Sequence, residues 1–230
     1  MPEPGKRSNR NRLFLKNDLL HIHLNNMATY ALVLLAAGSS NRLGQPKQLL
    51  PVDGKPLIVQ MANVALHSQC KRVFVVLGAY QDQIQPHLIA SNLTIVQNPL
   101  WEEGVASSIR TGVAASEKQI PDLNGIVFMT CDQPFVSPSV IDGLILRKEK
   151  TGKPMVASAY RDTMGIPAIF DKKYFPELQK LKGQQGAKKI FSNHRGSVET
   201  ISFPQGYIDI DTWDDFQLWQ HSQGSGERGE

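Results

Sequence analysis

Short apolar runs alternate with stretches of helical spacing along the first two thirds of the chain. The apolar runs, which predict buried strands, are 31–36, 73–77, 94–96, 126–129 and 154–157. Between them, apolar residues recur every three or four positions, which predicts helices. These stripes consist of Leu57, Met61, Val64, Ala65 and Leu66; of Ile84, Leu88 and Ile89; of Ile109, Val113 and Ala114; and of Val140, Leu144 and Ile145.

This alternation predicts an α/β fold with a mostly parallel sheet flanked by helices, because strands that alternate with helices of about 10–15 residues form βαβ units. Parallel strands are buried on both faces, which accounts for their uninterrupted apolar runs. Ligands of such sheets bind beyond the carboxyl ends of the strands, so the loops that follow the strands are where chemistry is expected. After residue 152 the pattern is less regular.

The positive charge of the chain is concentrated at its N-terminus. Residues 1–26 hold five basic and two acidic side chains, which is +3 of the formal net charge of +4. A near-neutral body argues against a broad nucleic-acid-binding face. We expect 1–26 to be a disordered or non-native extension, 27–220 to form one domain, and 221–230 to be a solvated tail.

Two further features bear on location. No segment approaches the roughly 20 apolar residues needed to cross a bilayer, and Lys16 and Asp18 interrupt the apolar pieces of the N-terminal segment, unlike in a signal peptide. Cys70 and Cys131 lie in apolar surroundings and form no C-x-x-C pair. We therefore expect a cytoplasmic protein without membrane attachment or a disulfide framework.

The first predicted strand leads into a loop rich in small and basic residues. Glycine allows an anion to approach the backbone, whose successive N–H groups can form an anion-binding nest. Arg42 can donate a bidentate fork to phosphate, and Lys47 supplies a compact charge. The spacing matches neither the P-loop nor the dinucleotide pattern. The alternative is an ordinary turn with solvated basic residues, and we favour phosphate binding.

Residues 35–57 read L-A-A-G-x-S-x-R-x-G-x-P-K-x-L-L-P-x-x-G-x-P-L. This resembles the signature of the MobA-like NTP transferase family, and most closely that of its molybdenum cofactor cytidylyltransferases. The resemblance implies a Rossmann-like domain, similar to nucleotide-diphospho-sugar transferases, that binds a nucleoside triphosphate and Mg²⁺. By that resemblance Arg42 and Lys47 hold the triphosphate. Ala37 stands where the guanylyltransferase branch usually has glycine, which favours CTP.

A second polar segment follows the third predicted strand and reads N-P-x-W-x-x-G-x-x-S-S. Physical reasoning leaves Ser107 open between a helix cap and a ligand contact, and Trp101 open between packing and stacking on a ring. The segment also resembles the nucleotide site of the cytidylyltransferases. The resulting nucleotide-binding set is Leu35, Ala36, Ala37, Gly38, Ser39, Arg42, Lys47, Gly78, Asn98, Gly104, Ser107 and Ser108.

Asp132 follows the apolar run 126–129 in the sequence C-D-Q-P. A carboxylate at the end of a parallel strand points into the ligand crevice and is a suitable Mg²⁺ ligand. A lone Asp at this place is more often a cap or turn former, but D-Q-P resembles the metal-binding strand end of the family. Asp132 is therefore predicted to be catalytic together with Arg42 and Lys47. Its neighbour Cys131 is read as a small buried residue.

The segment D-I-D-T-W-D-D-F, which starts at Asp209, resembles a family segment near the C-terminus, D-I-D-T-P-E-D-Y. One of its carboxylates can complete the Mg²⁺ site with Asp132. Alternation along an extended chain places Asp209 and Asp211 on one face. We expect Asp209 to be the second ligand, and Asp211 or Thr212 to cap a following helix.

The segments that resemble the acceptor side of the family depart from its pattern. Ile166 follows Gly165 where many relatives have histidine, and Gln184 and Lys188 replace an acidic residue and an arginine. Lys188 can meet a phosphate or be solvated. The resemblance thus implies transfer of CMP from CTP to molybdopterin or its molybdenum form, with release of diphosphate and with a molybdoenzyme or its maturation chaperone as a further partner. The alternatives are another nucleotide with another phosphate acceptor, and a non-catalytic cofactor or nucleotide carrier.

Overall fold

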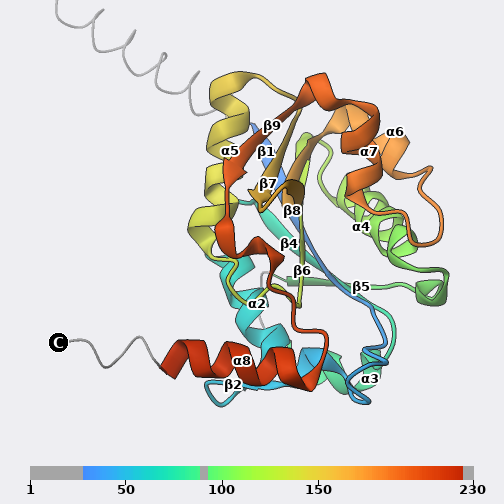
Figure 1. The fold of residues 1–230 in the computed structure, drawn as a ribbon. Coiled ribbons are helices and arrows are strands. Elements are labelled where there is room, and N and C mark those ends of the chain that lie inside the picture. The colour runs from blue at the N-terminus through green and yellow to red at the C-terminus, as the bar shows by residue number, and fades with distance from the viewer. Residues whose placement is uncertain (1–27, 89–92, 225–230) are drawn as a thin grey trace, which may run out of the picture.

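The computed structural model describes residues 28–88 and 93–224, which are built around one seven-stranded sheet with the order β5-β4-β1-β6-β8-β7-β9 (Figure 1). Its strands are β1 (Thr29–Ala36), β4 (Arg72–Leu77), β5 (Leu93–Gln97), β6 (Leu123–Thr130), β7 (Met155–Tyr160), β8 (Thr163–Asp171) and β9 (Val198–Ser202). The short strands β2 (Pro51–Val52) and β3 (Lys55–Pro56) form a separate hairpin. The helices are α2 (Leu57–Leu66), α3 (Gln81–Ile84), α4 (Val105–Gln119), α5 (Pro138–Thr151), α6 (Phe175–Leu178), α7 (Ala187–Asn193) and α8 (Trp213–Gly224).

Most neighbours in the sheet run parallel. β1 pairs in parallel with both β4 and β6, β4 with β5, and β7 with β9. Strand β8 runs antiparallel to its neighbours β6 and β7. Because β1 and β6 are adjacent and parallel, the loops that follow them leave the sheet at the same edge. This places the loop after β1 beside Asp132.

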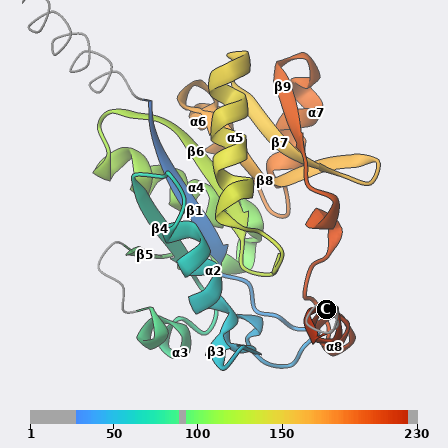
Figure 2. The ribbon, with the colours of Figure 1, turned by 90° about the vertical axis from the view of Figure 1, so that its left-hand side faces the viewer.

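Two apolar layers enclose the sheet. From β1, Leu32 and Leu34 pack on the side of α2 and α5, and Ala31 and Val33 pack on the side of α4 and α7. All four residues are fully buried. Figure 2 shows α2 and α5 on one side of the sheet and α4 on the other. The predicted α/β fold with a mostly parallel sheet is therefore confirmed.

The apolar runs correspond to β1, β4, β5, β6 and β7, and three of the four stripes correspond to α2, α4 and α5. Of the second stripe, Ile84 is the last residue of the short helix α3, and Leu88 lies beyond it. Ile89 of the second stripe lies outside the described residues. The apolar pattern does not predict β8 or β9. Gly165 and Pro167 make β8 look like a loop, since both residues weaken a strand pattern. Strand β9 mixes polar and apolar residues and is only partly buried.

Most of the two terminal segments, namely 1–27 and 225–230, lies outside the described residues. Helix α8 runs to Gly224, so four residues of the segment expected to be a tail belong to this helix. Within the described part of the chain, no helix is long and apolar enough to span a membrane.

Two helical glycines offer a matched test of the packing. A methyl group at Gly112 of α4 would lie 2.5 Å from Cγ1 of the buried Val33, whereas one at Gly143 of α5 would meet Cδ1 of Ile201 at 3.6 Å, an ordinary contact. We predict that Gly112→Ala lowers the free energy of unfolding by about 1–3 kcal/mol through overpacking. Gly143→Ala should raise it by about 0.5–1 kcal/mol, because alanine favours the helix. Urea denaturation of both variants measures the difference, and equal effects would contradict the tight contact between α4 and β1.

Candidate active site

A cavity of about 580 Å³ lies at the carboxyl ends of β1 and β6. One wall is the segment 35–39 with Lys47 and Gln48, a second comes from residues between 101 and 108, and a third is 130–132. Gln184 adds a side chain from the loop before α7. The cavity is therefore bounded by the loops that follow β1, β5 and β6, at the position expected for a ligand of a parallel sheet.

The loop after β1 is held by Gln48, which the sequence analysis did not single out. Its buried amide Nε2 donates hydrogen bonds to the carbonyl oxygens of Ala36 at 2.9 Å and Gly38 at 3.0 Å. The backbone N–H of Lys47 donates to Oγ of Ser40 at 3.1 Å. These bonds fix the start of the loop against its end, so the glycine-containing turn has a defined shape.

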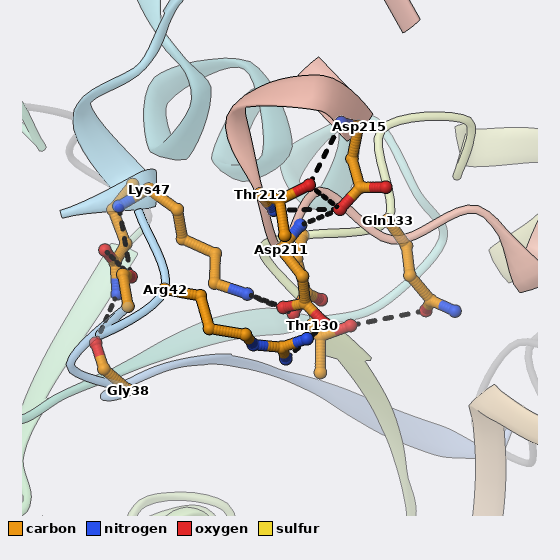
Figure 3. A network of polar contacts seen from close by, with 11 residues as sticks. Gly38, Arg42, Lys47, Thr130, Gln133, Asp211, Thr212 and Asp215 are labelled. Carbon is orange, nitrogen blue, oxygen red and sulfur yellow. Dashed lines mark hydrogen bonds and ion pairs between the residues drawn. The ribbon is translucent and has the colours of Figure 1, made fainter. Parts of the chain in front are cut away.

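Lys47 lies between two carboxylates that come from distant parts of the sequence. Its Nζ is 2.9 Å from Oδ2 of Asp132 and 2.7 Å from Oδ1 of Asp211. Nη2 of Arg42 is 2.7 Å from Oδ2 of the same Asp211. Figure 3 shows both basic side chains extending from the loop toward Asp211. The Lys47 side chain is 14% exposed and that of Arg42 is 69% exposed, so Lys47 is the inner charge of the network.

The pKa shifts of this network follow from its pairing. Burial alone would lower the pKa of Lys47, but the charges of Asp132 and Asp211 and their hydrogen bonds outweigh it and raise that pKa above its usual value. Burial would likewise raise the pKa of Asp211, yet Lys47 and Arg42 hold it below its usual value. Lys47 and Asp211 are therefore both charged at neutral pH.

Asp209 has a different environment from Asp211. Its pKa is raised to about 6, because its carboxylate is partly desolvated and faces the negative charges of Asp132 and Asp211. Between the two aspartates, Ile210 is fully buried, and its N–H donates to the carbonyl oxygen of Asp132 at 2.9 Å. This bond attaches the segment 209–211 to the end of β6.

Thr212 caps α8, which is one of the two alternatives that the sequence predicted. Oγ1 of Thr212 accepts a hydrogen bond from the N–H of Asp215 at 3.2 Å, and Oδ2 of Asp215 accepts from the N–H of Thr212 at 2.8 Å. This is a reciprocal capping arrangement. The same Oδ2 accepts from the N–H of Asp211 at 3.2 Å, so the start of α8 also orients the aspartate that contacts Lys47.

The polar residues after β5 divide into a cavity wall and a layer behind it. Gly104 and Ser108 line the cavity, whereas Asn98 and Ser107 are not part of its lining. Nδ2 of the buried Asn98 donates to Oγ of Ser107 at 2.8 Å and to Oγ of Ser108 at 3.0 Å. The N-cap of α4 is Gly104, so the cap interpretation of Ser107 is wrong; its hydroxyl donates instead to the carbonyl of Gly104 at 2.8 Å.

Gly78 and Trp101 shape the cavity by close packing. A methyl group at position 78 would lie 2.5 Å from Cβ of Trp101 and 2.9 Å from Cβ of Ala37. Gly78 is not part of the cavity lining, but its lack of a side chain lets Trp101 pack beside the loop after β1. Trp101 is half-buried and lines the cavity, so packing and contact with a ligand are compatible.

Comparisons with known proteins agree with this geometry. Residues 32–198 match the MobA-like NTP transferase domain. The chain belongs to this family. The crystal structure of Rv0371c from Mycobacterium tuberculosis H37Rv is similar to it, with a TM-score of 0.71 and 30% identity over 84% of this chain and 99% of that one. The same protein in complex with manganese matches with a TM-score of 0.68 and 26% identity over 85% and 100% of the two chains.

Two curated proteins that are similar to this chain carry different names. Nicotine blue oxidoreductase of Paenarthrobacter nicotinovorans is 33% identical over 138 residues, which are 60% of this chain and 64% of that protein. The molybdenum cofactor cytidylyltransferase of Escherichia coli (strain K12) is 29% identical over 94 residues, 40% and 48% of the two chains. The chain thus spans less than two thirds of the length of either relative. The two names describe different reactions, so the similarity does not identify the nucleotide or the acceptor of this protein.

The acidic side chains near Lys47 suit a divalent cation only in part. Asp132, Asp209 and Asp211 supply hard oxygen atoms, but among residues 28–88 and 93–224 no group of three or more His, Cys, Asp or Glu side chains is arranged for a metal. A cation here would therefore need ligands besides the protein. Mg²⁺ commonly meets this condition, because it binds one or two carboxylates together with substrate phosphates.

The remaining predicted residues lie as follows. Cys131 is buried, as expected, and burial raises the pKa of its thiol above the usual range. Among the residues that depart from the family pattern, Gln184 lines the cavity, whereas the carbonyl of Ile166 accepts a hydrogen bond from Nε2 of Gln133 at 3.2 Å. Lys188 is exposed on α7 and lines a separate cavity of about 500 Å³ together with Arg161.

The hydrogen bonds of Gln48 should contribute to the free energy of unfolding. Gln48→Leu removes the donor of two carbonyl groups, so we predict a loss of about 1–3 kcal/mol in the free energy of unfolding. Gln45 is exposed in the same loop and serves as the control: Gln45→Leu should change the free energy by less than about 0.5 kcal/mol. Denaturant unfolding of the two variants tests this, and similar stabilities would show that Gln48 does not hold the loop.

Proposed function

We propose that this protein transfers CMP from CTP to the terminal phosphate of molybdopterin, or of its molybdenum form, in a Mg²⁺-dependent reaction that releases diphosphate. The observation that carries the proposal is the position of Lys47, an inner cation at the cavity beside Asp132 and Asp211. Membership of the MobA-like NTP transferase family supports the reaction type. The similarity to a molybdenum cofactor cytidylyltransferase supports the choice of acceptor and nucleotide.

In the proposed reaction, an oxygen of the acceptor phosphate attacks the α-phosphorus of CTP. A new P–O bond forms there, the bond from the α-phosphorus to the oxygen shared with the β-phosphate breaks, and diphosphate leaves. A phosphate monoester is largely ionised near pH 7, so no general base is required. The protein contributes positions and charges, and this fits a cavity lined by Lys47 and Asp132.

Lys47 would stabilise the negative charge that develops around the α-phosphate. A side chain that is 14% exposed acts in a medium of lower effective dielectric than water, where a fixed charge has a larger effect. Arg42, which is more exposed and comes from the same loop, would contact the outer phosphates through its guanidinium fork. Both would contact phosphate oxygens through N–H groups that do not bond Asp211, so Asp211 would stay paired with them.

Asp132 and Asp209 would hold the Mg²⁺ ion, which supplies charge neutralisation of the triphosphate when bound. Asp211 is already paired with Lys47 and Arg42, and its pKa is lowered accordingly. Asp209, by contrast, forms no ion pair within the described residues, and burial together with the charges of Asp132 and Asp211 raises its pKa to about 6, so an added cation would stabilise its charge. The chemistry of the donor set therefore favours Asp209 over Asp211.

The triphosphate and base would lie along the segment 35–39, Gly104 and Ser108, which line the same cavity. Asn98, Ser107 and Gly78 would act from behind this wall by holding Ser108 and Trp101 in place. Ala37 is part of the wall, at the position where the guanylyltransferase pattern has glycine. Its methyl group would leave less room for the base than a glycine would. CTP is therefore the preferred nucleotide, with GTP as the alternative that a nucleotide panel tests.

The catalytic assignments can be tested by single-turnover transfer from α-labelled CTP to molybdopterin. We predict that Lys47→Met and Asp132→Asn each lower the rate by at least about 100-fold, as expected for removal of a group that stabilises transition-state charge. Lys55→Met, an exposed lysine of the hairpin β2–β3, is the control and should retain the rate. Rates close to wild type in either variant would remove its role. CTP binding without diphosphate release would favour a carrier.

The metal assignment can be tested with Mn²⁺ as a paramagnetic probe in the presence of CTP. We predict that Asp209→Asn weakens Mn²⁺ binding by at least about tenfold, because a carboxylate ligand is lost. Asp211→Asn should weaken it less, since this carboxylate pairs with Lys47 and Arg42. Electron paramagnetic resonance titration measures free Mn²⁺ directly. The opposite order of the two variants would assign the second ligand to Asp211.

A further inference from the structure

Glu103 and Arg110 form an ion pair behind one wall of the nucleotide cavity, by which we mean the cavity of about 580 Å³ around Lys47. Nη1 and Nη2 of Arg110 lie 2.8 Å and 2.5 Å from Oε1 and Oε2 of Glu103, so the guanidinium fork meets the carboxylate through two hydrogen bonds. Glu103 ends the 3₁₀ turn Trp101–Glu103, and Arg110 belongs to α4. Neither residue lines the cavity, and the proposed reaction gives neither a role.

The pair is bonded to the loop 181–186, which comes from a distant part of the chain and precedes α7. Nη1 of Arg110 also donates a hydrogen bond to the carbonyl oxygen of Leu181 at 2.7 Å. Oε1 of Glu103 also accepts one from the N–H of Gly183 at 3.2 Å. Both members of the pair therefore hold this loop against the start of α4.

The close approach of the loop depends on Gly104. Its φ of +117° is a conformation that side chains rarely adopt, and a methyl group there would lie 2.6 Å from the carbonyl oxygen of Gly183 and 2.8 Å from Nε2 of Gln184. The N–H of Ala106 donates to the same carbonyl oxygen at 3.1 Å. The side chain of Gln184 is thereby placed beside the backbone of Gly104.

Both members of the pair are charged at neutral pH. Hydrogen bonds from Arg110 and from the N–H of Gly183 lower the pKa of Glu103 to about 2, and the bond to Glu103 raises the pKa of Arg110. The Arg110 and Glu103 side chains are 22% and 35% exposed. Ion pairs that are open to solvent contribute little to the free energy of unfolding, so loss of this pair should alter the loop rather than the fold.

Gln184 is the residue through which the loop 181–186 reaches the cavity. It lines the nucleotide cavity, and its side chain is exposed and forms no hydrogen bond within the described residues. Its amide offers an acceptor oxygen and two N–H donors without a charge. Lys188, which also departs from the family pattern, lines a different cavity. The two departures therefore belong to different sites.

The charges of the nucleotide cavity distinguish two of its walls. Lys47 lies at the wall that it shares with Asp132, whereas the wall beside Gln184 contains the carboxylate of Glu102. A triphosphate is attracted to Lys47 and repelled by Glu102. The uncharged ribose and base would then lie toward Gln184, where an amide can bond hydroxyl, amino and carbonyl groups.

We propose that the Glu103–Arg110 pair positions a nucleotide contact: it holds the loop 181–186 so that the amide of Gln184 bonds the ribose or base of the nucleoside triphosphate. Gln184 makes the contact, and Glu103 and Arg110 are positioning residues that act through it. This inference rests on the proposed function only in that a nucleoside triphosphate occupies this cavity.

The test measures, by calorimetry on the full chain, the dissociation constants of CTP and of inorganic triphosphate, each with Mg²⁺. We expect Gln184→Ala to weaken CTP binding about three- to tenfold, as for loss of one hydrogen bond, and to leave triphosphate binding unchanged. Glu103→Gln and Arg110→Met should show the same selective effect. Removal of the negative charge of Glu103 would by itself strengthen binding of a polyanion, so weaker binding by Glu103→Gln has to come from position.

A double-mutant cycle tests whether the pair acts through Gln184. Glu103→Gln should then have less than about a twofold further effect on CTP binding in the Gln184→Ala background. Asp122→Asn is the matched control, because Asp122 also pairs with a basic side chain, Lys71 at 3.3 Å, and is not part of the cavity lining. It should bind CTP like wild type, and denaturant unfolding checks that every variant is folded.

Additive effects in the cycle, equal weakening of CTP and triphosphate binding, or wild-type CTP binding in all three single variants would overturn the inference. The same titrations with GTP cover the alternative nucleotide. Transfer to molybdopterin is assayed separately. CTP binding that depends on Gln184, without transfer by wild type, would contradict only the proposed function. Normal transfer with CTP binding independent of Gln184 would contradict only the present inference.

Discussion

A partly buried ammonium group needs negative partners, and Lys47 has them in Asp132 and Asp211. The three residues follow β1, follow β6 and precede α8, so one cation joins three segments that are far apart in the sequence. Without these carboxylates, burial would lower the pKa of Lys47 and weaken its charge. The position of Lys47 and its positive charge thus depend on the fold, which brings Asp132 and Asp211 to it.

The sheet makes this arrangement possible. Parallel pairing of β1 with β6 brings the loop after β1 beside Asp132, and the hydrogen bond from Ile210 to Asp132 adds the C-terminal segment. Three carboxylates then lie near two basic side chains, and Asp209 is the one that forms no ion pair within the described residues. The same local charge that holds Lys47 therefore also favours a further cation. A nucleoside triphosphate accompanied by a divalent ion would supply negative phosphates for the basic side chains and a positive ion for the carboxylates.

The fold could be predicted to the extent that it depends on local pattern. Uninterrupted apolar runs identify β1, β4, β5, β6 and β7, whereas β8 contains Gly165 and Pro167 and gives no such signal. Lys47 and Asp132 could be named because each follows a predicted strand. The roles of Gln48 and Ser107 could not, because they depend on hydrogen bonds set by the path of the chain. Likewise, alternation shows that Asp209 and Asp211 share a face, but it cannot show which one Lys47 contacts.

The cap of α8 has a consequence for the dynamics of the site. Asp215 accepts hydrogen bonds from the N–H groups of both Thr212 and Asp211. Fraying of the first helical turn would release the backbone of Asp211 and, with it, one of the two anchors of Lys47. Local unfolding equilibria couple groups in this way without a change elsewhere in the fold. The order of the inner cation is therefore tied to the helix content of the C-terminal segment, so hydrogen exchange at the start of α8 reports on a side chain that belongs to the opposite end of the sequence.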